Sequence, residues 1–218
     1  MCTVCIGRCM RQAIVTGASR GIGKAVADAL EADGYNVHRI STAVLDVSDR
    51  EAVYRFVKPL ERVDVLVNCA GIGHYNLIED LDEDNIRRVY DVNVMGTVHF
   101  CKACLPLMKE QGDGLIVNIG SLRGINCTKG RAAYTMSKIA VRAFSKTLGM
   151  ELSEHGVRVT CINPGYVYTD MLQWRIERDG LRPEDILQPK DIADTVMMLT
   201  SLSEGARVEE INMGEVWD

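Results

Sequence analysis

A tyrosine and a lysine stand four residues apart in the stretch YTMSK, at Tyr134 and Lys138. An α-helix turns every ~3.6 residues, so a helix over this stretch would carry both side chains on one face. Tyrosine, with an ordinary pKa near ~10, is a poor acid–base catalyst at neutral pH, but a neighbouring ammonium group is expected to lower that pKa. The pair therefore indicates either proton-transfer chemistry or ordinary packing between helix neighbours, and the rest of the chain must decide between the two.

A glycine-rich segment near the start of the chain predicts a nucleotide-binding turn. The run TGASRGIG, at residues 16–23, carries glycines at 17, 21 and 23. It follows the apolar run Gln12 to Thr16 and precedes an alanine-rich stretch that ends at Gly34. Glycines permit a tight turn and a close approach of the backbone to a pyrophosphate, which then lies at the N-terminus of the following helix. We expect a strand, this turn and a helix over residues 22–33.

Short apolar runs alternate with helical patterns along the remaining chain. The runs lack polar alternation, as parallel strands covered on both faces do. They lie at residues 12–16, 36–40, 63–68, 115–120 and 158–163. Helices are expected from near Asp49, where Ser48 and Glu51 form a capping box, from Asp84 to Gly112, and over residues 132–155. The alternation predicts a doubly wound parallel sheet with helices on both faces, a Rossmann fold.

One connection departs from this pattern. Residues 37–46, VHRISTAVLD, are too few for a parallel crossover, which needs a dozen residues or more and usually a helix. We therefore expect the helix between the second and third strands to be missing or reduced, and the third strand to be a short stub or absent.

Composition limits the class of protein. The chain has 218 residues, 47% of them hydrophobic, and a net charge of -5. This length suits one domain, which we place at residues 10–218, and the acidic balance disfavours a broad basic face for nucleic acid. No run reaches the ~18–20 apolar residues of a membrane span, so we expect no membrane partner and a cytoplasmic protein.

Eight cysteines are divided between the N-terminus and the expected core. Cys2, Cys5 and Cys9 form a cluster with three ligands, and a closed structural zinc site needs a fourth. We expect no metal there and a disordered leader over residues 1–9. The other five fall in expected strands and helices and are interpreted as buried thiols.

Taken in order, the motifs resemble those of the short-chain dehydrogenase/reductase (SDR) family. They are TGASRGIG, NCAG at 68–71, VNVMG with Asn93, NIGS with Ser121, YTMSK, and NPGYVYTDM at 163–171. The resemblance implies a catalytic tetrad of Asn93, Ser121, Tyr134 and Lys138. In it Tyr134 would donate the proton, Lys138 would supply the cation and hold the nicotinamide ribose, Ser121 would bind the substrate oxygen, and Asn93 would hold a water linked to Lys138.

The same resemblance implies a nicotinamide cofactor. The residues expected to bind it are Gly17, Ser19, Arg20, Gly21, Ile22, Gly23, Ser41, Asp46, Val47, Asn68, Ala70, Gly71, Tyr134, Lys138, Pro164, Gly165, Val167 and Thr169. An acidic side chain after the second strand would accept the ribose hydroxyl of NAD, whereas this position falls near the neutral Ser41 and Thr42. Arg20 supplies positive charge for the phosphate of NADP, so NADP(H) is favoured over NAD(H), unless Arg20 is an ordinary solvated loop residue.

The substrate is less constrained by the sequence. NIGS and PGYVYTDM are most similar to 3-oxoacyl-acyl-carrier-protein reductases, which predicts reduction of a 3-oxoacyl thioester or similar ketone. Arg123, Lys129 and Arg131 would then attract an acidic carrier protein, although such a cluster is also typical of a solvated face. The alternatives are an SDR enzyme of another alcohol, sugar or carbonyl compound, and a non-catalytic NADP sensor, which the complete tetrad disfavours. The resemblance also implies a homodimer or homotetramer through the helices that carry Asn93 and Tyr134.

Overall fold

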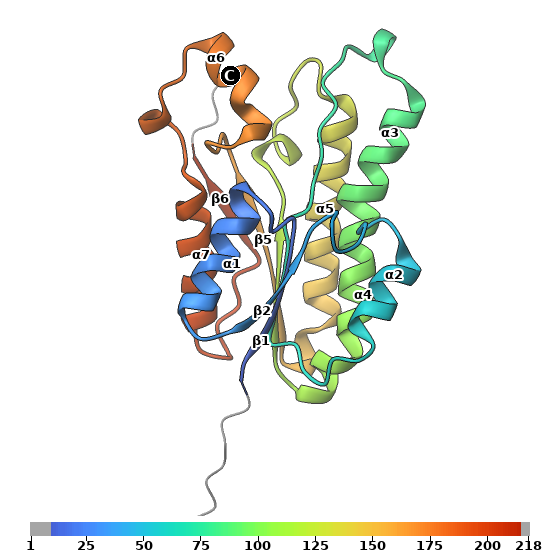
Figure 1. Cartoon of the computed structure of the whole chain (residues 1–218), viewed down its shortest axis with the longest axis vertical. Helices are drawn as coiled ribbons and strands as arrows, with labels where there is room; N and C mark the ends of the chain where they lie inside the picture. The colour runs from blue at the N-terminus through green and yellow to red at the C-terminus, as the bar shows by residue number, and fades with distance from the viewer. Residues whose placement is uncertain (1–9, 215–218) are drawn as a thin grey trace, which may run out of the picture.

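A computed structural model describes residues 10–214, except the side chains of residues 174 and 175. One parallel sheet lies between two layers of helices (Figure 1). Its strands are β1 Gln12–Thr16, β2 Asn36–Ile40, β3 Val65–Asn68, β4 Gly114–Ile119, β5 Val157–Pro164 and β6 Glu210–Met213. The α-helices are α1 Gly21–Ala32, α2 Arg50–Val57, α3 Glu83–Tyr90, α4 Gly96–Gln111, α5 Ala132–Glu151, α6 Gln173–Asp179 and α7 Pro189–Ser201. The short helical segments are η1 Ile78–Asp80, η2 Asp91–Met95, η3 Leu122–Gly124, η4 Ser153–His155, η5 Asp170–Leu172 and η6 Pro183–Asp185.

The sheet has a point at which the chain changes direction. Its strand order is β2-β1-β3-β4-β5-β6, and every neighbouring pair is parallel. From β1 the chain goes first to one side, to β2, and then returns to the other side, to β3. Ligands of such sheets bind outside the carboxyl ends of the strands at this point. The glycine-rich turn after β1 and the NCAG segment after β3 both lie there.

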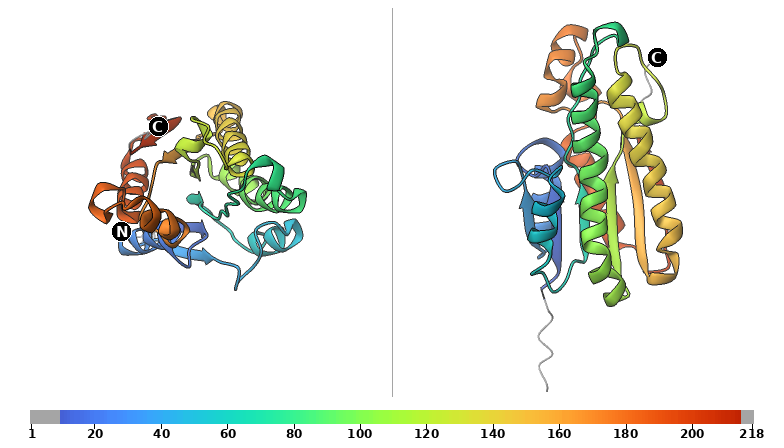
Figure 2. Two further views of the ribbon diagram at one scale, coloured as in Figure 1. Left: turned by 90° about the horizontal axis from the view of Figure 1, so that it is seen from above. Right: turned by 90° about the vertical axis from the view of Figure 1, so that its right-hand side faces the viewer.

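Two apolar clusters, one on each face, hold the helices to the sheet. On one face Val26 and Leu30 of α1 join Ile192 and Val196 of α7, all fully buried. On the other face α2, α4 and α5 pack together, with Phe100 of α4 fully buried among them. Figure 2, seen from above, shows the two helix layers separated by the strands. The doubly wound Rossmann-like fold expected from the alternation of apolar runs is thus confirmed.

The shortened connection after β2 also behaves as expected. Residues 41–49 contain neither strand nor helix, and the chain reaches β3 through α2 alone. Because no strand lies beyond it among the described residues, β2 forms one edge of the sheet. At the opposite edge, β6 pairs with β5. No strand was expected at β6, whose residues alternate polar and apolar and are only partly buried, unlike the continuous buried run of β3.

Three expected helix features were wrong in detail. The N-cap of α2 is Asp49, which accepts from Ala52 N at 3.0 Å, while the Ser48 hydroxyl donates to Asp46 instead. The expected helix from Asp84 begins after Asp82, whose carboxylate accepts from the Asp84 backbone. This helix is also interrupted, because the π-helical segment η2 separates α3 from α4. Among the described residues, no helix is long and apolar enough to cross a bilayer.

Candidate active site

A small cavity opens at the carboxyl ends of the strands, where the motifs meet. Its volume is about 90 Å³. It is lined by Ile22, Cys69, Gly71, Ile119, Gly120, Ser121, Tyr134, Lys138, Pro164, Gly165, Val167, Thr169, Met171 and Leu172. Eight of these were expected to bind the cofactor, and Ser121 was expected in the tetrad. Elements separated by more than 140 residues therefore contribute to one site.

The glycine-rich turn is built for close backbone approach. Gly17 has a φ of +68°, and a Cβ atom there would lie 2.9 Å from the Ala70 backbone. At Gly23 a Cβ atom would lie 2.3 Å from the Gly17 carbonyl oxygen. The Thr16 hydroxyl fixes the neighbouring segment by accepting from the backbone N–H groups of Cys69 and Ala70, both at 3.0 Å. This tight cradle at the N-terminus of α1 fits a dinucleotide pyrophosphate.

Tyr134 lies in the first turn of α5 and faces the cavity together with Ser121. The Ser121 hydroxyl hydrogen-bonds to the Tyr134 phenol and also accepts from Arg123 N at 3.1 Å. Ser121 follows β4, and its backbone N–H donates to the Asn163 side chain at 3.3 Å. The ring of Tyr75 meets that of Tyr134 edge-on, with centroids 6.1 Å apart. The phenol is thus held beside a second hydroxyl, where a substrate oxygen could bind both.

Lys138 is one helical turn beyond Tyr134 and is almost fully buried. Its ammonium nitrogen donates to the Ile119 carbonyl oxygen at 2.8 Å and lies 5.7 Å from the centre of the Tyr134 ring. The expected proximity of the two side chains is therefore present. A Cβ atom at Gly71 would lie 3.7 Å from this nitrogen, so the glycine leaves space on that side of the ammonium group.

Burial shifts the pKa of both members of this pair. It raises the pKa of Tyr134 above its ordinary value, against the hydrogen bond from Ser121 and the charges of Arg131 and Arg123, which lower it. Burial also lowers the pKa of Lys138. From the sequence, the nearby cation was expected to lower the pKa of Tyr134. In the structure the loss of hydration outweighs the neighbouring positive charges.

Asn93 is held inside the protein by η2. Its amide nitrogen donates to the Ile72 carbonyl oxygen at 2.9 Å and to the Ser137 hydroxyl at 3.0 Å, and its oxygen accepts from Ile72 N at 2.8 Å. Ser137 in turn donates to the Tyr134 carbonyl oxygen. Asn93 therefore joins the segment after β3 to the helix that carries Tyr134 and Lys138. Its expected water-holding role stays a prediction.

Several expected cofactor residues lie outside the cavity. Arg20 is exposed, with its nearest charged partner Asp170 at 3.5 Å. Ser41 follows the end of β2, where the Ile40 carbonyl oxygen accepts from Ala18 N in the glycine-rich turn. The glycine-rich turn therefore lies beside the end of β2, while the Arg20 guanidinium is directed toward Asp170.

The remaining expected contacts are less accessible. The Asp46 carboxylate is bound by Ser48 and by Arg88, at 2.8 Å from the guanidinium. Val47 is buried against Gly96. The Asn68 side chain is turned into the core, where its amide donates to Asn118 at 2.9 Å. The buried Val47 and Asn68 side chains support the site from behind, and only their backbones remain candidates for cofactor contact. The Asp46 side chain is 43% exposed and remains a candidate itself.

The expected basic surface is much reduced. Arg131 is 5% exposed and its guanidinium lies over the Tyr75 ring at 4.6 Å. Arg123 is partly buried and donates to Thr128 and Tyr166. Only Lys129 of the three is exposed. The prediction of a three-residue docking patch was wrong for Arg131, because its side chain is buried against the Tyr75 ring.

Four supporting residues were missed by sequence reasoning. Thr16, Cys69, Ser137 and Asn163 each contact a motif backbone or a predicted catalytic side chain. All four lie inside or beside the quoted motifs, so their position was the available signal. The cysteines at 2, 5 and 9 lie outside the described residues. Among those residues, no group of three potential ligands is placed to hold a metal ion.

Comparisons with known proteins agree with this arrangement. The family model described as short chain dehydrogenase matches residues 36–179. An uncharacterized oxidoreductase of Staphylococcus saprophyticus is 32% identical over 233 residues, covering 94% of this chain and 97% of the relative. An uncharacterized oxidoreductase of Staphylococcus aureus is 31% identical over 227 residues, covering 94% and 96%.

Two solved structures are also similar to this chain. ElxO with NADP bound has a TM-score of 0.84 and 25% identity, covering 94% of this chain and 98% of that chain. The ligand-free aldohexose dehydrogenase of Thermoplasma acidophilum has a TM-score of 0.86 and 26% identity, covering 94% and 92%. Each similarity extends over nearly the whole chain.

Proposed function

The chain belongs to the short-chain dehydrogenase family, and from this we propose that it reduces a ketone with NADPH, using Tyr134 as the proton donor. The observation that carries the proposal is the convergence of Ser121, Tyr134 and Lys138 on one cavity beside the glycine-rich turn. An NAD(P)-dependent oxidoreductase needs a cofactor cradle and a proton donor side by side. This site offers both.

The chemistry divides between the cofactor and the chain. When bound, the reduced nicotinamide supplies a hydride to the substrate carbon, which leaves negative charge on the carbonyl oxygen. The Ser121 hydroxyl orients that oxygen, and the Tyr134 phenol gives it a proton. A raised pKa keeps this phenol protonated at neutral pH, which suits donation. Lys138 places positive charge beside the resulting phenolate and favours it.

NADP(H) is proposed over NAD(H). Arg20 is exposed in the glycine-rich turn, which lies beside the end of β2, where Ser41 and Thr42 replace an acidic side chain; Arg39 of β2 is already paired with Asp28 and Glu31. A structural neighbour, ElxO, was solved with NADP bound. A phosphate on the adenosine ribose would compete with Asp170 for Arg20. The 3.5 Å pair is highly exposed on both sides and therefore weak, so it poses little barrier.

For the substrate we propose a 3-oxoacyl thioester. Between β5 and α7 the chain forms only the short η5, the seven-residue α6 and η6, and of these only η5 lines the cavity, which leaves room for an extended substrate. Met171 and Leu172 supply apolar contact at its mouth. The loss of Arg131 from the surface reduces the electrostatic attraction for an acidic carrier protein. A thioester of a small carrier such as coenzyme A is therefore the substrate to test.

A panel of carbonyl compounds tests this proposal. Purified protein with NADPH is assayed against acetoacetyl-CoA, diacetyl, simple aldehydes and an aldohexose, by loss of absorbance from the reduced nicotinamide. Preference for acetoacetyl-CoA is expected. Turnover confined to aldehydes or sugars would retain the catalytic residues and reject the thioester. Tight NADPH binding without turnover on any compound would favour the sensor alternative.

The assembly state and location are proposals as well. A homodimer or homotetramer through the helices that carry Asn93 and Tyr134 is supported by Met95, which is 41% exposed on this surface. A monomeric mass by light scattering at micromolar concentration would contradict it. A cytoplasmic location likewise stays a prediction.

A further inference from the structure

A buried side chain behind the catalytic cavity holds the segment that carries Ser121. Asn163 of β5 is fully buried, and its amide oxygen accepts from the Ser121 backbone N–H at 3.3 Å and from the Cys161 thiol at 3.4 Å. A Cβ atom at Gly120 would lie 2.1 Å from this oxygen, so a glycine is needed for the amide to come this close. Ser121 lines the catalytic cavity, and its hydroxyl meets the Tyr134 phenol. The position of the Asn163 amide therefore bears on the position of Ser121.

The nitrogen of the same amide faces the edge of the sheet. It donates to the Glu210 carboxylate at 3.0 Å and to the side-chain oxygen of Asn212 at 3.0 Å. Glu210 is the first residue of the edge strand β6, and the register of the sheet places it beside Cys161 of β5. The amide thus has partners at both its oxygen and its nitrogen, which holds it in one orientation.

Glu210 determines which way the Asn163 amide points. An ionised carboxylate only accepts hydrogen bonds, and a backbone N–H only donates them. The nitrogen of Asn163 must therefore face Glu210, and its oxygen must face Ser121. Without the carboxylate, the nitrogen would keep only Asn212 as a partner among the described residues, and an amide side chain can present either its oxygen or its nitrogen.

A charged pair holds Glu210 in place and links it to α5. The Arg142 guanidinium donates at 2.9 Å to the carboxylate oxygen that also accepts from Asn163. The Glu210 side chain is 25% exposed, so this charge-assisted bond is partly withdrawn from water. Arg142 lies about two helical turns beyond Tyr134. The three residues Arg142, Glu210 and Asn163, here called the back network, therefore join the helix of Tyr134 to the segment of Ser121.

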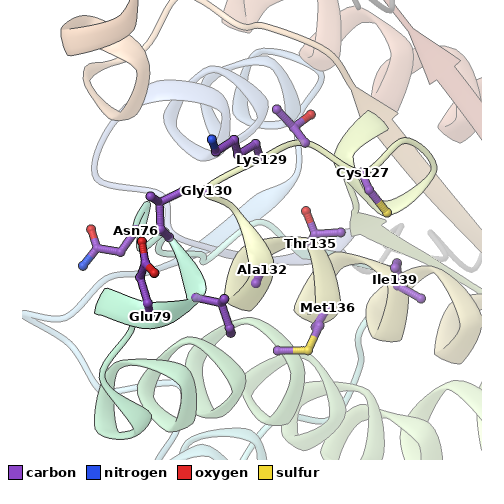
Figure 3. A pocket seen from close by; sticks show the side chains of 12 residues that line it. Asn76, Glu79, Cys127, Lys129, Gly130, Ala132, Thr135, Met136 and Ile139 are labelled. Atoms are coloured by element: carbon purple, nitrogen blue, oxygen red, sulfur yellow. The ribbon is translucent and has the colours of Figure 1, made fainter.

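The back network borders the catalytic cavity through Ser121 and contributes to no other cavity described here. The first turns of α5 also border a second cavity of about 630 Å³, with Thr135, Met136 and Ile139 on its wall (Figure 3). None of the three residues of the back network lines that cavity. A change in the back network is therefore expected to act at the catalytic cavity.

We propose that Glu210 is a positioning residue for the reduction, which through the Asn163 amide holds Ser121 where its hydroxyl can orient the substrate oxygen beside Tyr134. This inference rests on the proposed function, in which Ser121 and Tyr134 bind that oxygen. Glu210 does not line the catalytic cavity, so its effect on turnover passes through Asn163.

Hydrogen exchange and steady-state kinetics test this role together. The full-length protein, labelled with ¹⁵N and without cofactor, gives the exchange rate of the Ser121 backbone amide by NMR. The amide of Ile14, fully buried in β1, is the internal reference. Turnover is measured with NADPH on the carbonyl compound that the wild type reduces fastest. A wild type that reduces none of the compounds refutes the proposed function, while the exchange rates still decide whether Glu210 holds Ser121.

Glu210→Ala should loosen Ser121 and slow the reaction. Exchange at Ser121 should become about 10-fold faster, while exchange at Ile14 stays unchanged, because the opening is local. The kcat should fall about 10-fold or more, since a small misplacement of a group that orients the substrate is costly. The KM of the substrate and the Kd of NADPH should stay within about two-fold of the wild type.

Two matched variants separate positioning from charge and from the general effect of a substitution in this segment. Glu210→Gln keeps an oxygen for the Asn163 nitrogen, and Arg142, which only donates, orients that oxygen. It should restore most of the lost kcat. Glu209→Ala removes the exposed neighbouring carboxylate and should change neither the Ser121 exchange nor the kcat.

Four outcomes would overturn the proposal. Exchange at Ser121 may stay at the wild-type rate in Glu210→Ala, or it may rise while the kcat is unchanged. Equal acceleration at Ser121 and Ile14 would make Glu210 a general stabiliser of the sheet. A Glu210→Gln variant as slow as Glu210→Ala would assign the effect to charge. Each of these results rejects the positioning role.

Discussion

Asn93→Ala should destabilise the protein and also reduce its turnover, because the side chain joins two segments of the active site. The substitution removes three hydrogen bonds, with the Ile72 N–H, the Ile72 carbonyl oxygen and the Ser137 hydroxyl. An unsatisfied buried partner costs about 1–3 kcal/mol, and the Ile72 groups are only partly buried, so we expect a loss of about 2–4 kcal/mol in the free energy of unfolding. For a chain of this length that corresponds to a melting temperature lower by about 5–15 °C.

Thermal unfolding followed by circular dichroism measures the change in melting temperature. Asn76→Ala is the control, because Asn76 is exposed and makes one long hydrogen bond, at 3.3 Å, to Asp80. Its melting temperature should change by less than about 2 °C. A cycle with Ser137→Ala should give a coupling energy of about 1 kcal/mol between the two residues. If Asn93→Ala melts within 2 °C of the wild type and still loses activity, the asparagine acts on the chemistry alone and the joining role is wrong.

Three further predictions concern charge and protonation. Lys138→Met should reduce turnover about 10²-fold or more and weaken NADPH binding. Its melting temperature should stay the same or rise, because burial already disfavours the ammonium form. Unchanged turnover in steady-state assays would contradict the role of Lys138. Arg20→Ala should raise the Kd of NADPH about 10-fold or more and leave that of NADH nearly unchanged, measured by fluorescence titration, since a phosphate contact is a charge-assisted hydrogen bond; equal losses for both would reject it. Burial raises the pKa of the Cys69 and Cys161 thiols to about 11 and that of Cys101 to about 12, from an ordinary 9.0. As the pH rises, these thiols therefore ionise in the unfolded chain before they do so in the folded protein. The free energy of unfolding should fall by about 1 kcal/mol per thiol between pH 9 and pH 10. A urea midpoint that stays constant over this range would contradict this prediction.

Local patterns predicted most of the fold because each strand is a short buried run next to a helix. The bounds of β1 and β2 match the expected runs at both ends. Helix starts were less certain, since Asp82 and Asp84, or Ser48 and Asp49, offer nearly equivalent caps and only the tertiary approach of the chain selects one. The π-helical η2 leaves no period in the sequence, yet it sets the position of Asn93.

The motifs predicted which residues meet in the site, but they did not predict the direction of the Tyr134 pKa shift. Spacing placed Tyr134 and Lys138 on one helix face, as observed. The pKa shift of Tyr134 depends on how much water the fold removes, and on Arg131 and Arg123, whose approach no local spacing shows. The burial of Arg131 and the inward turn of Asn68 are likewise results of long-range packing.

The proposed role of Tyr134 as proton donor in an NADPH-dependent reduction is tested most directly by Tyr134→Phe, with NADPH oxidation measured against acetoacetyl-CoA and NADPH binding measured in the same preparation. Turnover is expected to fall at least about 10²-fold while the Kd of NADPH stays within about two-fold. Turnover at the wild-type rate in Tyr134→Phe would contradict it.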